Sequence, residues 1–281
     1  MITRISVLGA GTMGHGIAYA ALTGGFETCL FDVSGEALEK ARAQIGGIAR
    51  KAVELGKLSA ADAEAALERL RSSNDLATAV RDADMVIEAV PEKIELKLEL
   101  LAKLETLAPP AAVIASNTSA LSITEMAAVL SRPGRVAGMH FFNPVHKMRL
   151  VEIVRALESA PETLQVIEDV ARQMGKETVL VRESPGFITS RVNAMIGNEA
   201  FYMLQEGVAS AADIDKALKL GLNHPMGPFE LVDLVGLDTR LSVLQFMHRT
   251  MGEKYRPCPL LVQYVKAGRL GKKAGRGVYD Y

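Results

Sequence analysis

The sequence is poor in cysteine, in aromatic residues and in net charge. Its 281 residues include two cysteines and no tryptophan, aromatic residues make up 5%, and the formal net charge is -1. Two cysteines are too few for a disulfide framework or a metal cluster, so we expect no bound metal and a reducing compartment, the cytoplasm. The chain also lacks the basic excess that nucleic acid or an anionic membrane attracts, so neither is an expected partner.

Long hydrophobic runs are missing as well. No apolar stretch reaches the length that crosses a membrane, and Met1 leads into a strand-like segment without a basic, apolar leader. We therefore expect a protein that is neither exported nor membrane-spanning. What the chain does have, 49% hydrophobic and 23% charged residues, is typical of a globular protein, and its length favours one large domain plus a smaller one.

Short apolar runs alternate with helix-like segments over the first two thirds of the chain. The runs occupy residues 4–10, 27–33, 84–90, 112–117, 135–141, 150–154 and 177–182. A small, apolar helix is expected at residues 13–25, and helical composition continues from Ser34 to Leu70, with a second capping serine at Ser59. This alternation predicts an α/β domain of residues 1–184, a Rossmann-like, doubly wound, mostly parallel sheet with an inserted helical hairpin.

The pattern changes near Pro185. From Phe187 to about Lys266 the sequence contains helix-like stretches separated by prolines and no convincing strand. Residues 185–281 are therefore predicted to form an all-α C-terminal domain. Its apolar segments "AMIGNEAFYML" and "LSVLQFM" fit either the core of a monomer or the contact of a dimer.

The segment "GAGTMG" follows the first predicted strand and opens the first helix. Gly9 permits a tight turn, Gly11 lets the backbone approach a diphosphate, and Gly14 allows close packing of helix and strand. Asp32, at the end of the second strand, can accept hydrogen bonds from a ribose diol and repels a 2'-phosphate. The loop, with Thr12 and Met13 between its glycines, predicts NAD rather than NADP; the alternative is a glycine-rich turn beside a solvated aspartate.

A histidine and a glutamate interrupt two apolar runs in "GMHFFNPVHKMRLVEIV". Glu152 alternates with apolar residues on one strand face, so a buried carboxylate is expected there, and it needs a partner. His140, across the Asn-Pro turn, is the candidate, because a carboxylate on one ring nitrogen leaves the other to exchange a proton with a substrate. Spacing alone allows equally a purely structural His-Glu bond.

Several motifs together resemble those of the (S)-3-hydroxyacyl-CoA dehydrogenases, especially the short bacterial 3-hydroxybutyryl-CoA enzymes. The resemblance covers essentially the whole chain and rests on the segments "GAGTMG", "IEAVPE", "ASNTSALSI", "GMHFFNPV", "LVEIV", "SPGFITSRV", "GLNHPMGPFELVDLVGLD" and "LGKKAGRGVYDY". The glycine fingerprint is shared with many dehydrogenases, whereas "HFFNPV" and "PMGPFEL" are specific to this family.

The resemblance implies roles for residues that the sequence pattern leaves open. His140 matches the general acid/base and Glu152 the carboxylate that orients it. Ser119 matches a serine that contacts both substrate and cofactor. The further positions that match cofactor contacts are Glu92, Lys97, Asn117, Asn143 and Lys273. Without the resemblance, Glu92 and Lys97 would be read as a solvated helix start, Asn143 as a turn former and Lys273 as part of a flexible basic terminus.

One position departs from the family pattern. Members of the family carry an asparagine immediately before the arginine of the "PGF" motif, where it contacts the acyl substrate, and this chain has Ser190 there. Ser190 is the first candidate for that contact and Asn193, one helical turn later, is the second.

The resemblance implies NAD-dependent interconversion of 3-hydroxyacyl-CoA and 3-ketoacyl-CoA, and a homodimer formed through the C-terminal domain. Lys51 and Lys57 on the helical hairpin could contact the CoA nucleotide, although such charges more often form a solvated face. The alternative activity is that of the crystallin-like L-gulonate dehydrogenases, which share "HFFNP". An NAD-binding protein without turnover is a third class, but it would have no use for the His140–Glu152 pair.

Overall fold

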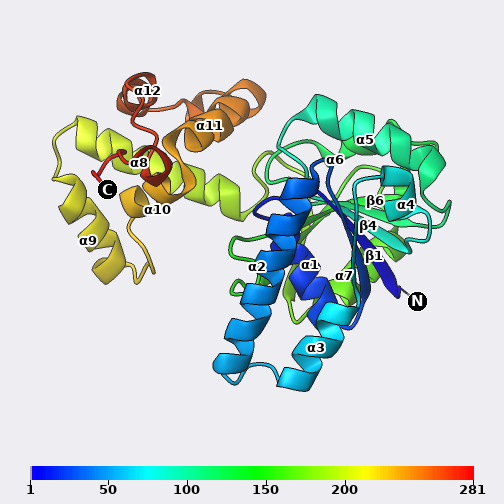
Figure 1. The fold of residues 1–281 in the computed structure, drawn as a ribbon. Helices are drawn as coiled ribbons and strands as arrows, with labels where there is room; N and C mark the ends of the chain where they lie inside the picture. Colours follow the sequence, from blue (N-terminus) through cyan, green and yellow to red (C-terminus); the bar gives the residue numbers. More distant parts are fainter. Residues whose placement is uncertain (1) are drawn as a thin grey trace. The chain divides into compact units, whose positions relative to one another are not determined.

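The computed structural model describes residues 2–281, which divide into two compact units (Figure 1). The first unit ends at Glu183 and the second runs from Ser184 to Tyr281. This division falls within two residues of Pro185, where the composition of the sequence changes.

The first unit is built on one eight-stranded sheet in the order β3-β2-β1-β4-β5-β6-β7-β8. Its strands are β1 (Arg4–Leu8), β2 (Glu27–Phe31), β3 (Leu70–Ser73), β4 (Met85–Glu88), β5 (Val113–Ser116), β6 (Val136–Phe141), β7 (Leu150–Arg155) and β8 (Glu177–Arg182). All neighbouring pairs are parallel except β6 and β7, which are antiparallel. The predicted doubly wound, mostly parallel sheet is therefore confirmed.

Strand β3 is absent from the sequence prediction, which extended helical structure as far as Leu70. Instead α3 (Ala60–Glu68) ends before it, and the segment "LRSS" pairs with β2 at the edge of the sheet. The prediction was wrong here because this strand has a single apolar residue and is only partly buried. An edge strand needs no continuous apolar run, so its sequence carries little signal.

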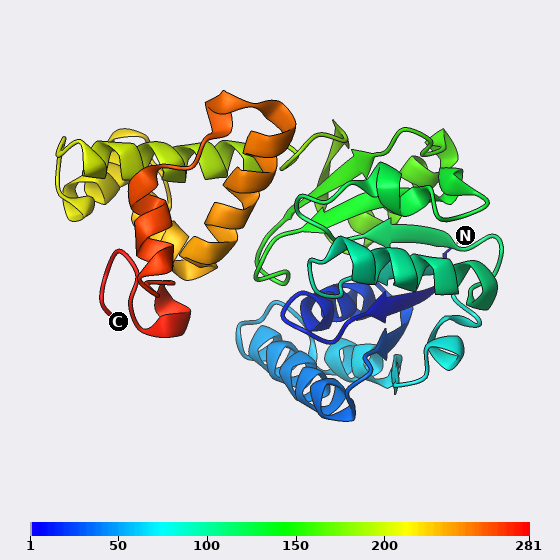
Figure 2. The same cartoon turned by 90° about the horizontal axis from the view of Figure 1, so that it is seen from above.

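Helices cover both faces of this sheet (Figures 1 and 2). They are α1 (Gly14–Thr23), α2 (Gly35–Glu54), α3, α4 (Leu76–Val80), α5 (Ile94–Leu107), α6 (Ile123–Ala127) and α7 (Pro161–Gln173). The serines expected to cap the hairpin helices do so: the Ser34 side chain accepts from the Ala37 amide and Ser59 from the Asp62 amide. The predicted helical hairpin is therefore present as α2–α3, and in the structure it lies between β2 and β3 along the chain.

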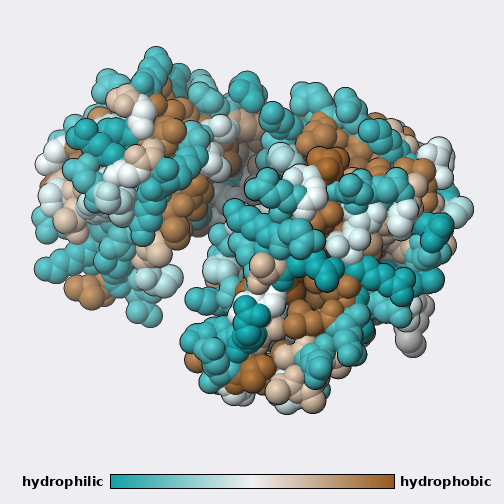
Figure 3. All heavy atoms as spheres, viewed as in Figure 1, coloured by the Kyte–Doolittle hydropathy of each residue, from teal (hydrophilic) through white to brown (hydrophobic). Residues whose placement is uncertain are grey.

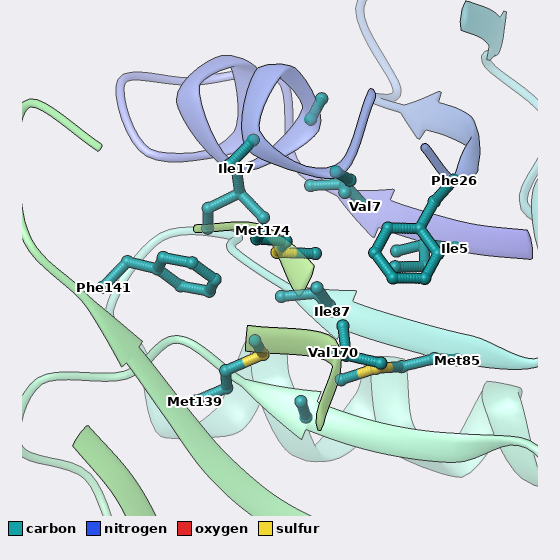
Figure 4. Close-up of a cluster of buried hydrophobic side chains, with 14 of the residues drawn as sticks. Ile5, Val7, Ile17, Phe26, Met85, Ile87, Met139, Phe141, Val170 and Met174 are labelled. Carbon is teal, nitrogen blue, oxygen red and sulfur yellow. The ribbon is translucent and has the colours of Figure 1, made fainter. Parts of the chain in front are cut away.

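One apolar layer fixes α1 against the strands that lead to the predicted site. Figure 4 shows Ile17 of α1 above Val7, Phe141 and Met174, and all four side chains are buried. At about 25 cal/mol per Å² of buried apolar surface, such a layer is the main source of stability for the first unit. The loops at the ends of β1 and β6 are thus held by a common core.

The second unit is helical, and no strand occurs among its described residues. Its helices are α8 (Thr189–Gln205), α9 (Ala211–Gly221), α10 (Pro228–Val235), α11 (Leu237–Met251) and α12 (Pro259–Lys266). At its centre the ring of Phe201 meets those of Phe229 and Tyr264 edge-on, with centroids 5.2 and 5.7 Å apart. The predicted all-α C-terminal region is confirmed.

Two buried aspartates anchor the C-terminal tail to the helices of the second unit. Asp233 accepts hydrogen bonds from the amides of Val278 and Tyr279 and from the hydroxyl of Tyr281. Asp215 accepts one from the Tyr279 hydroxyl at 2.7 Å. The tail is thus held in place by specific contacts, unlike the flexible terminus that the sequence left open as an alternative.

The described residues contain no helix with the length and apolarity needed to cross a membrane. Both cysteines, Cys29 in the first unit and Cys258 in the second, are unpaired thiols.

Candidate active site

The three glycines of the first loop differ in why they must be glycine. Gly9 has φ +105°, and a Cβ there would lie 2.6 Å from the Ala89 carbonyl oxygen. At Gly14 a Cβ would lie 1.7 Å from the carbonyl oxygen of Gly9, so the turn and helix start could not pack. Nothing lies within 4 Å of a Cβ at Gly11. The fold itself therefore requires glycine at positions 9 and 14. At Gly11 the absence of a side chain leaves open space that a diphosphate could occupy.

Asp32 lies where β2 ends, beside this loop. Its Oδ2 accepts a hydrogen bond from the Ala10 amide at 2.8 Å, and its Oδ1 accepts one from the Ser34 amide at 3.0 Å. These bonds fix the half-buried carboxylate next to the glycine loop at the carboxyl ends of β1 and β2. Together with the open position at Gly11 and the amino end of α1, where Thr12 and Met13 lie, this arrangement fits the diphosphate and ribose of a dinucleotide.

His140 and Glu152 are directly opposite one another on the antiparallel strands β6 and β7. His140 Nδ1 lies 2.7 Å from Glu152 Oε2, with Glu152 fully buried and His140 6% exposed. Phe142 packs on the imidazole at a centroid distance of 4.6 Å. The pair that the sequence suggested thus exists, and the carboxylate holds the ring through Nδ1.

The loops that follow β4 and β5 meet near the same edge of the sheet. Glu92 Oε1 accepts hydrogen bonds from the Ser119 amide at 2.9 Å and from the Thr118 hydroxyl at 2.6 Å. Asn117 Oδ1 accepts one from the Phe141 amide, next to His140, at 2.9 Å. The structure therefore brings Glu92, Asn117 and Ser119 together at the carboxyl ends of the strands, where open α/β sheets bind ligands.

Lys97 is 1% exposed, so it is not part of the solvated helix face that the sequence allowed as an alternative. Its Nζ lies 2.6 Å from Glu88 Oε1, 3.4 Å from Glu92 Oε2 and 3.2 Å from the Val90 carbonyl oxygen. Glu88 is fully buried and also accepts from the Val90 amide and the Ser116 hydroxyl. This network ties the end of β4 to α5 and to the end of β5.

Glu88 is a residue that the sequence interpretation missed, although a signal was present. It interrupts the apolar run "DMVIEAV" as Glu152 interrupts "LVEIV". A carboxylate inside an apolar strand implies a cationic or donor partner in both cases. A partner was predicted for Glu152 alone.

Asn143 is exposed in the loop between β6 and β7, next to the cis peptide bond that it forms with Pro144. This places its side chain on the segment that follows His140 and Phe142. A cofactor contact by Asn143 stays a prediction.

The two lysines expected to contact a nucleotide lie on the α2–α3 hairpin. Lys51 forms an exposed ion pair with Glu54 at 2.9 Å, and Lys57 is exposed in the turn between the helices. Between α2 and α3 lies a groove of about 640 Å³, over which Figure 3 shows brown, apolar surface at the lower centre. Its walls include Val53, Ala63 and Leu67. The groove is separate from the His140–Glu152 pair, and a contact of either lysine with substrate stays a prediction.

The remaining predicted residues belong to the second unit. Ser190 and Asn193 are both half-buried near the amino end of α8, about one turn apart. Lys273 is exposed, and its Nζ lies 2.7 Å from Asp238 Oδ1. Partial burial alone would raise the pKa of Asp238, but the hydrogen bond from Lys273 and its charge outweigh this and lower the pKa. The roles of these three residues toward substrate and cofactor stay predictions.

Two family models match this chain, one for each unit. That of the 3-hydroxyacyl-CoA dehydrogenase NAD binding domain matches residues 4–184. That of the 3-hydroxyacyl-CoA dehydrogenase C-terminal domain matches residues 186–281. The first match agrees with the glycine loop and Asp32, and it confirms NAD as the predicted cofactor.

Full-length relatives agree with the family models. The chain is 47% identical over 281 residues to a probable 3-hydroxybutyryl-CoA dehydrogenase of Bacillus subtilis, covering 100% of this chain and 98% of that protein. It is 43% identical over 288 residues to a 3-hydroxybutyryl-CoA dehydrogenase of Bradyrhizobium diazoefficiens, covering 100% and 96%. The crystal structure of (S)-3-hydroxybutyryl-CoA dehydrogenase from Ralstonia eutropha superposes with a TM-score of 0.96 at 42% identity, covering 100% and 99%. The fold, the site and these matches agree that the chain belongs to the 3-hydroxyacyl-CoA dehydrogenase family.

Proposed function

We propose that this chain interconverts (S)-3-hydroxyacyl-CoA and 3-ketoacyl-CoA with NAD, and that 3-hydroxybutyryl-CoA is its main substrate. The observation that carries the proposal is the His140–Glu152 pair at 2.7 Å, in the same unit as a dinucleotide-type glycine loop. A protein that only binds NAD needs the loop, but it has no need of a buried acid/base pair. The names of the full-length relatives support the four-carbon substrate.

In this mechanism His140 is the general acid/base. Because Glu152 engages Nδ1, we assign proton exchange with the substrate to Nε2, which accepts the proton of the 3-hydroxyl group on oxidation and returns it on reduction. The Glu152 carboxylate stabilises the imidazolium that forms. Bound NAD supplies the hydride acceptor at the substrate carbon.

We assign cofactor binding to the glycine loop and Asp32. The open space at Gly11 and the amino end of α1 suit the diphosphate, and Asp32 suits the ribose diol. Glu92, Asn117, Asn143, Lys97 and Lys273 are proposed as further contacts or supports for it.

Substrate contacts are assigned to Ser119, and after it to Ser190 and Asn193. The Ser119 amide is held by Glu92 at 2.9 Å, so its hydroxyl is carried on a fixed loop near the end of β5. Ser190 and Asn193 share one turn of α8, which is why either can supply the donor that the family's asparagine provides.

Replacing His140 by Gln tests the proposal. We expect kcat for acetoacetyl-CoA reduction to fall by about 100- to 10,000-fold, the usual contribution of a general acid/base, while the Kd for NADH stays within about twofold. Glu152→Gln is the matched variant, and it should lower kcat less because the imidazole itself remains. Full turnover by His140→Gln, or wild-type activity on L-gulonate in place of acyl-CoA, would overturn the assignment.

We also propose a homodimer formed through the second unit. The helical faces that the sequence offered for this contact are largely internal: Leu241, Leu244 and Met247 lie in the core of that unit. Other apolar side chains of the second unit support the proposal, since Leu220 is 77% and Leu222 66% exposed. Light scattering after size exclusion should give twice the 30.2 kDa chain mass, and a monomer would refute the dimer.

A cytoplasmic location is proposed from the two unpaired cysteines. Cell fractionation tests it, and recovery from a membrane or secreted fraction would contradict it.

A further inference from the structure

Thr118 is the most buried residue of the loop between β5 and α6. It is 1% exposed, whereas the residues on either side of it are partly exposed. Its hydroxyl donates to Glu92 Oε1 at 2.6 Å, and the same hydroxyl accepts hydrogen bonds from the amides of Leu121 at 3.0 Å and Ala120 at 3.4 Å. A threonine hydroxyl has one donor and two acceptor positions, so all of them are used within the protein.

These bonds enclose Ser119 on both sides. The Ser119 amide donates to Glu92 Oε1 at 2.9 Å, the same oxygen that accepts the Thr118 hydroxyl. The amides of the two residues that follow Ser119 donate to the Thr118 oxygen. The backbone at Ser119 is therefore fixed by the side chain that precedes it and by a carboxylate from the loop after β4.

The Ser119 hydroxyl is held less tightly than its backbone. It lies 3.3 Å from Glu92 Oε1, which is the longest of the three bonds that this oxygen accepts and is long for a bond between a hydroxyl and a carboxylate. Ser119 is also partly exposed. Its hydroxyl can thus exchange Glu92 for a ligand oxygen while Thr118 keeps the loop in place.

Glu92 is in turn held by a buried charge. Its side chain is 40% exposed, and by itself such a carboxylate would not fix a loop. Its second oxygen, Oε2, lies 3.4 Å from the ammonium group of Lys97, which is 1% exposed and pairs with the fully buried Glu88 at 2.6 Å. The loop that carries Ser119 is therefore tied, through Thr118 and Glu92, to the end of β4.

We propose that Thr118 is a positioning residue, which sets the Ser119 hydroxyl in the direction of the substrate oxygen. The inference rests on the proposed function, in which Ser119 contacts the substrate. The family pattern supplied roles for Ser119 and Glu92, and the structure adds Thr118. The alternative is a Thr118 hydroxyl that only stabilises the fold. The two roles can be separated, because only the positioning role depends on the hydroxyl of Ser119.

A double-variant cycle makes this separation. Thr118→Val removes the hydroxyl and keeps the branched shape of the side chain, whereas Thr118→Ser keeps the hydroxyl. Ser119→Ala removes the group on which Thr118 acts, and Thr118→Val/Ser119→Ala completes the cycle. The control is Thr163→Val, which removes another buried threonine hydroxyl. That hydroxyl donates to the Gly134 carbonyl oxygen at 2.8 Å, before the start of β6 and so at the opposite end of this strand from His140.

The assay is steady-state reduction of acetoacetyl-CoA by NADH. We expect Ser119→Ala to lower kcat by about 100-fold, the usual effect of removing one donor to a developing oxyanion. Thr118→Val should lower kcat by about tenfold and change KM by less than about threefold, because a displaced donor loses most where charge develops. In the Ser119→Ala background the same substitution should lower kcat by less than about twofold. Thr118→Ser and Thr163→Val should both remain close to the wild type.

The melting temperature of each variant shows whether it is folded in the assay. If Thr118→Val melts below the assay temperature, Thr118→Ala replaces it in the cycle, since it also lacks the hydroxyl and leaves room beside Glu92. If both variants are unfolded, the hydroxyl supports the fold and the inference is overturned.

The inference would also be overturned by an equal loss of kcat with and without the Ser119 hydroxyl, because Thr118 would then act independently of Ser119. Unchanged kcat in Thr118→Val, or a Thr118→Ser variant as slow as Thr118→Val, would have the same consequence. A wild type that does not reduce acetoacetyl-CoA, or a fully active Ser119→Ala, would instead overturn the proposed function or its assignment of Ser119, on which the inference depends.

Discussion

We expect the substitution Gly11→Ala to weaken NADH binding without lowering the stability of the fold. A Cβ at Gly11 meets no atom within 4 Å, and the backbone there is not left-handed, so the folded protein can accept alanine. Replacing glycine by alanine at a compatible position changes stability by about 0.4–1 kcal/mol in the favourable direction, because the unfolded chain loses freedom. If the space is reserved for the dinucleotide, the methyl group should instead weaken NADH binding by about tenfold or more, which is about 1.4 kcal/mol.

Gly14→Ala is the matched control, because here the protein itself fills the space. Its Cβ would lie 1.7 Å from the carbonyl oxygen of Gly9 and 2.8 Å from the carbonyl carbon, so backbone must move. Overpacking of this kind costs about 3 kcal/mol, and for a unit of this size it should lower Tm by about 6–12 °C.

Calorimetry and NADH fluorescence titration measure the two effects separately. Gly11→Ala should keep or slightly raise the Tm of the wild type while its Kd for NADH rises, and Gly14→Ala should have a lower Tm than the wild type. The reasoning would be refuted if Gly11→Ala bound NADH with wild-type affinity, because the open space would then have no ligand. It would equally be refuted if Gly11→Ala unfolded as early as Gly14→Ala.

Two further predictions concern buried charge and pH. Lys97→Met leaves the carboxylate of Glu88 buried without its cation, so it should lower the free energy of unfolding by about 3–5 kcal/mol in a denaturant titration. The double variant Glu88→Gln/Lys97→Met should recover part of this loss. If Lys97→Met unfolded at the same denaturant concentration as the wild type, the importance of the pair would be contradicted. Partial burial alone would raise the pKa of Asp84, but hydrogen bonds from the Thr3 and Arg4 amides and side chains outweigh it and hold the pKa at about 2. The folded pKa is thus below the unfolded one, so Asp84→Asn should cost about 1–2 kcal/mol at neutral pH, and the difference from wild type should vanish as the pH falls from about 4 to about 2. A difference that is constant with pH would contradict this.

Much of the first unit could be predicted because its strands are buried on both faces. Strands β4 and β6 are buried at every position and are apolar except for Glu88 and His140, and the glycine loop marks the first strand-to-helix turn. His140 and Glu152 could be paired in advance because a carboxylate in an apolar strand needs a partner, and the loop between the strands is short. Local pattern and tertiary structure agree in this part of the chain.

The rest depends on contacts between segments distant in sequence. Strand β3 is a polar edge strand, and nothing in "LRSS" distinguishes it from a loop. Asp233 resembles any helical aspartate in the sequence, yet its carboxylate binds the amides of Val278 and Tyr279, which are far along the chain. Lys97 likewise looks like a surface lysine until the fold places it beside Glu88. Such pairings follow from the packed structure and have no local signature.

The antiparallel pairing of β6 with β7 fixes the position of the acid/base pair. The ladder sets His140 opposite Glu152, so the dyad is fixed by strand register and not by the loop that joins the two strands. Substitutions at exposed positions of that loop should therefore leave the distance between His140 and Glu152 unchanged. The geometry of the acid/base pair is thus a property of the sheet, and it should persist in any variant that keeps the register of β6 and β7.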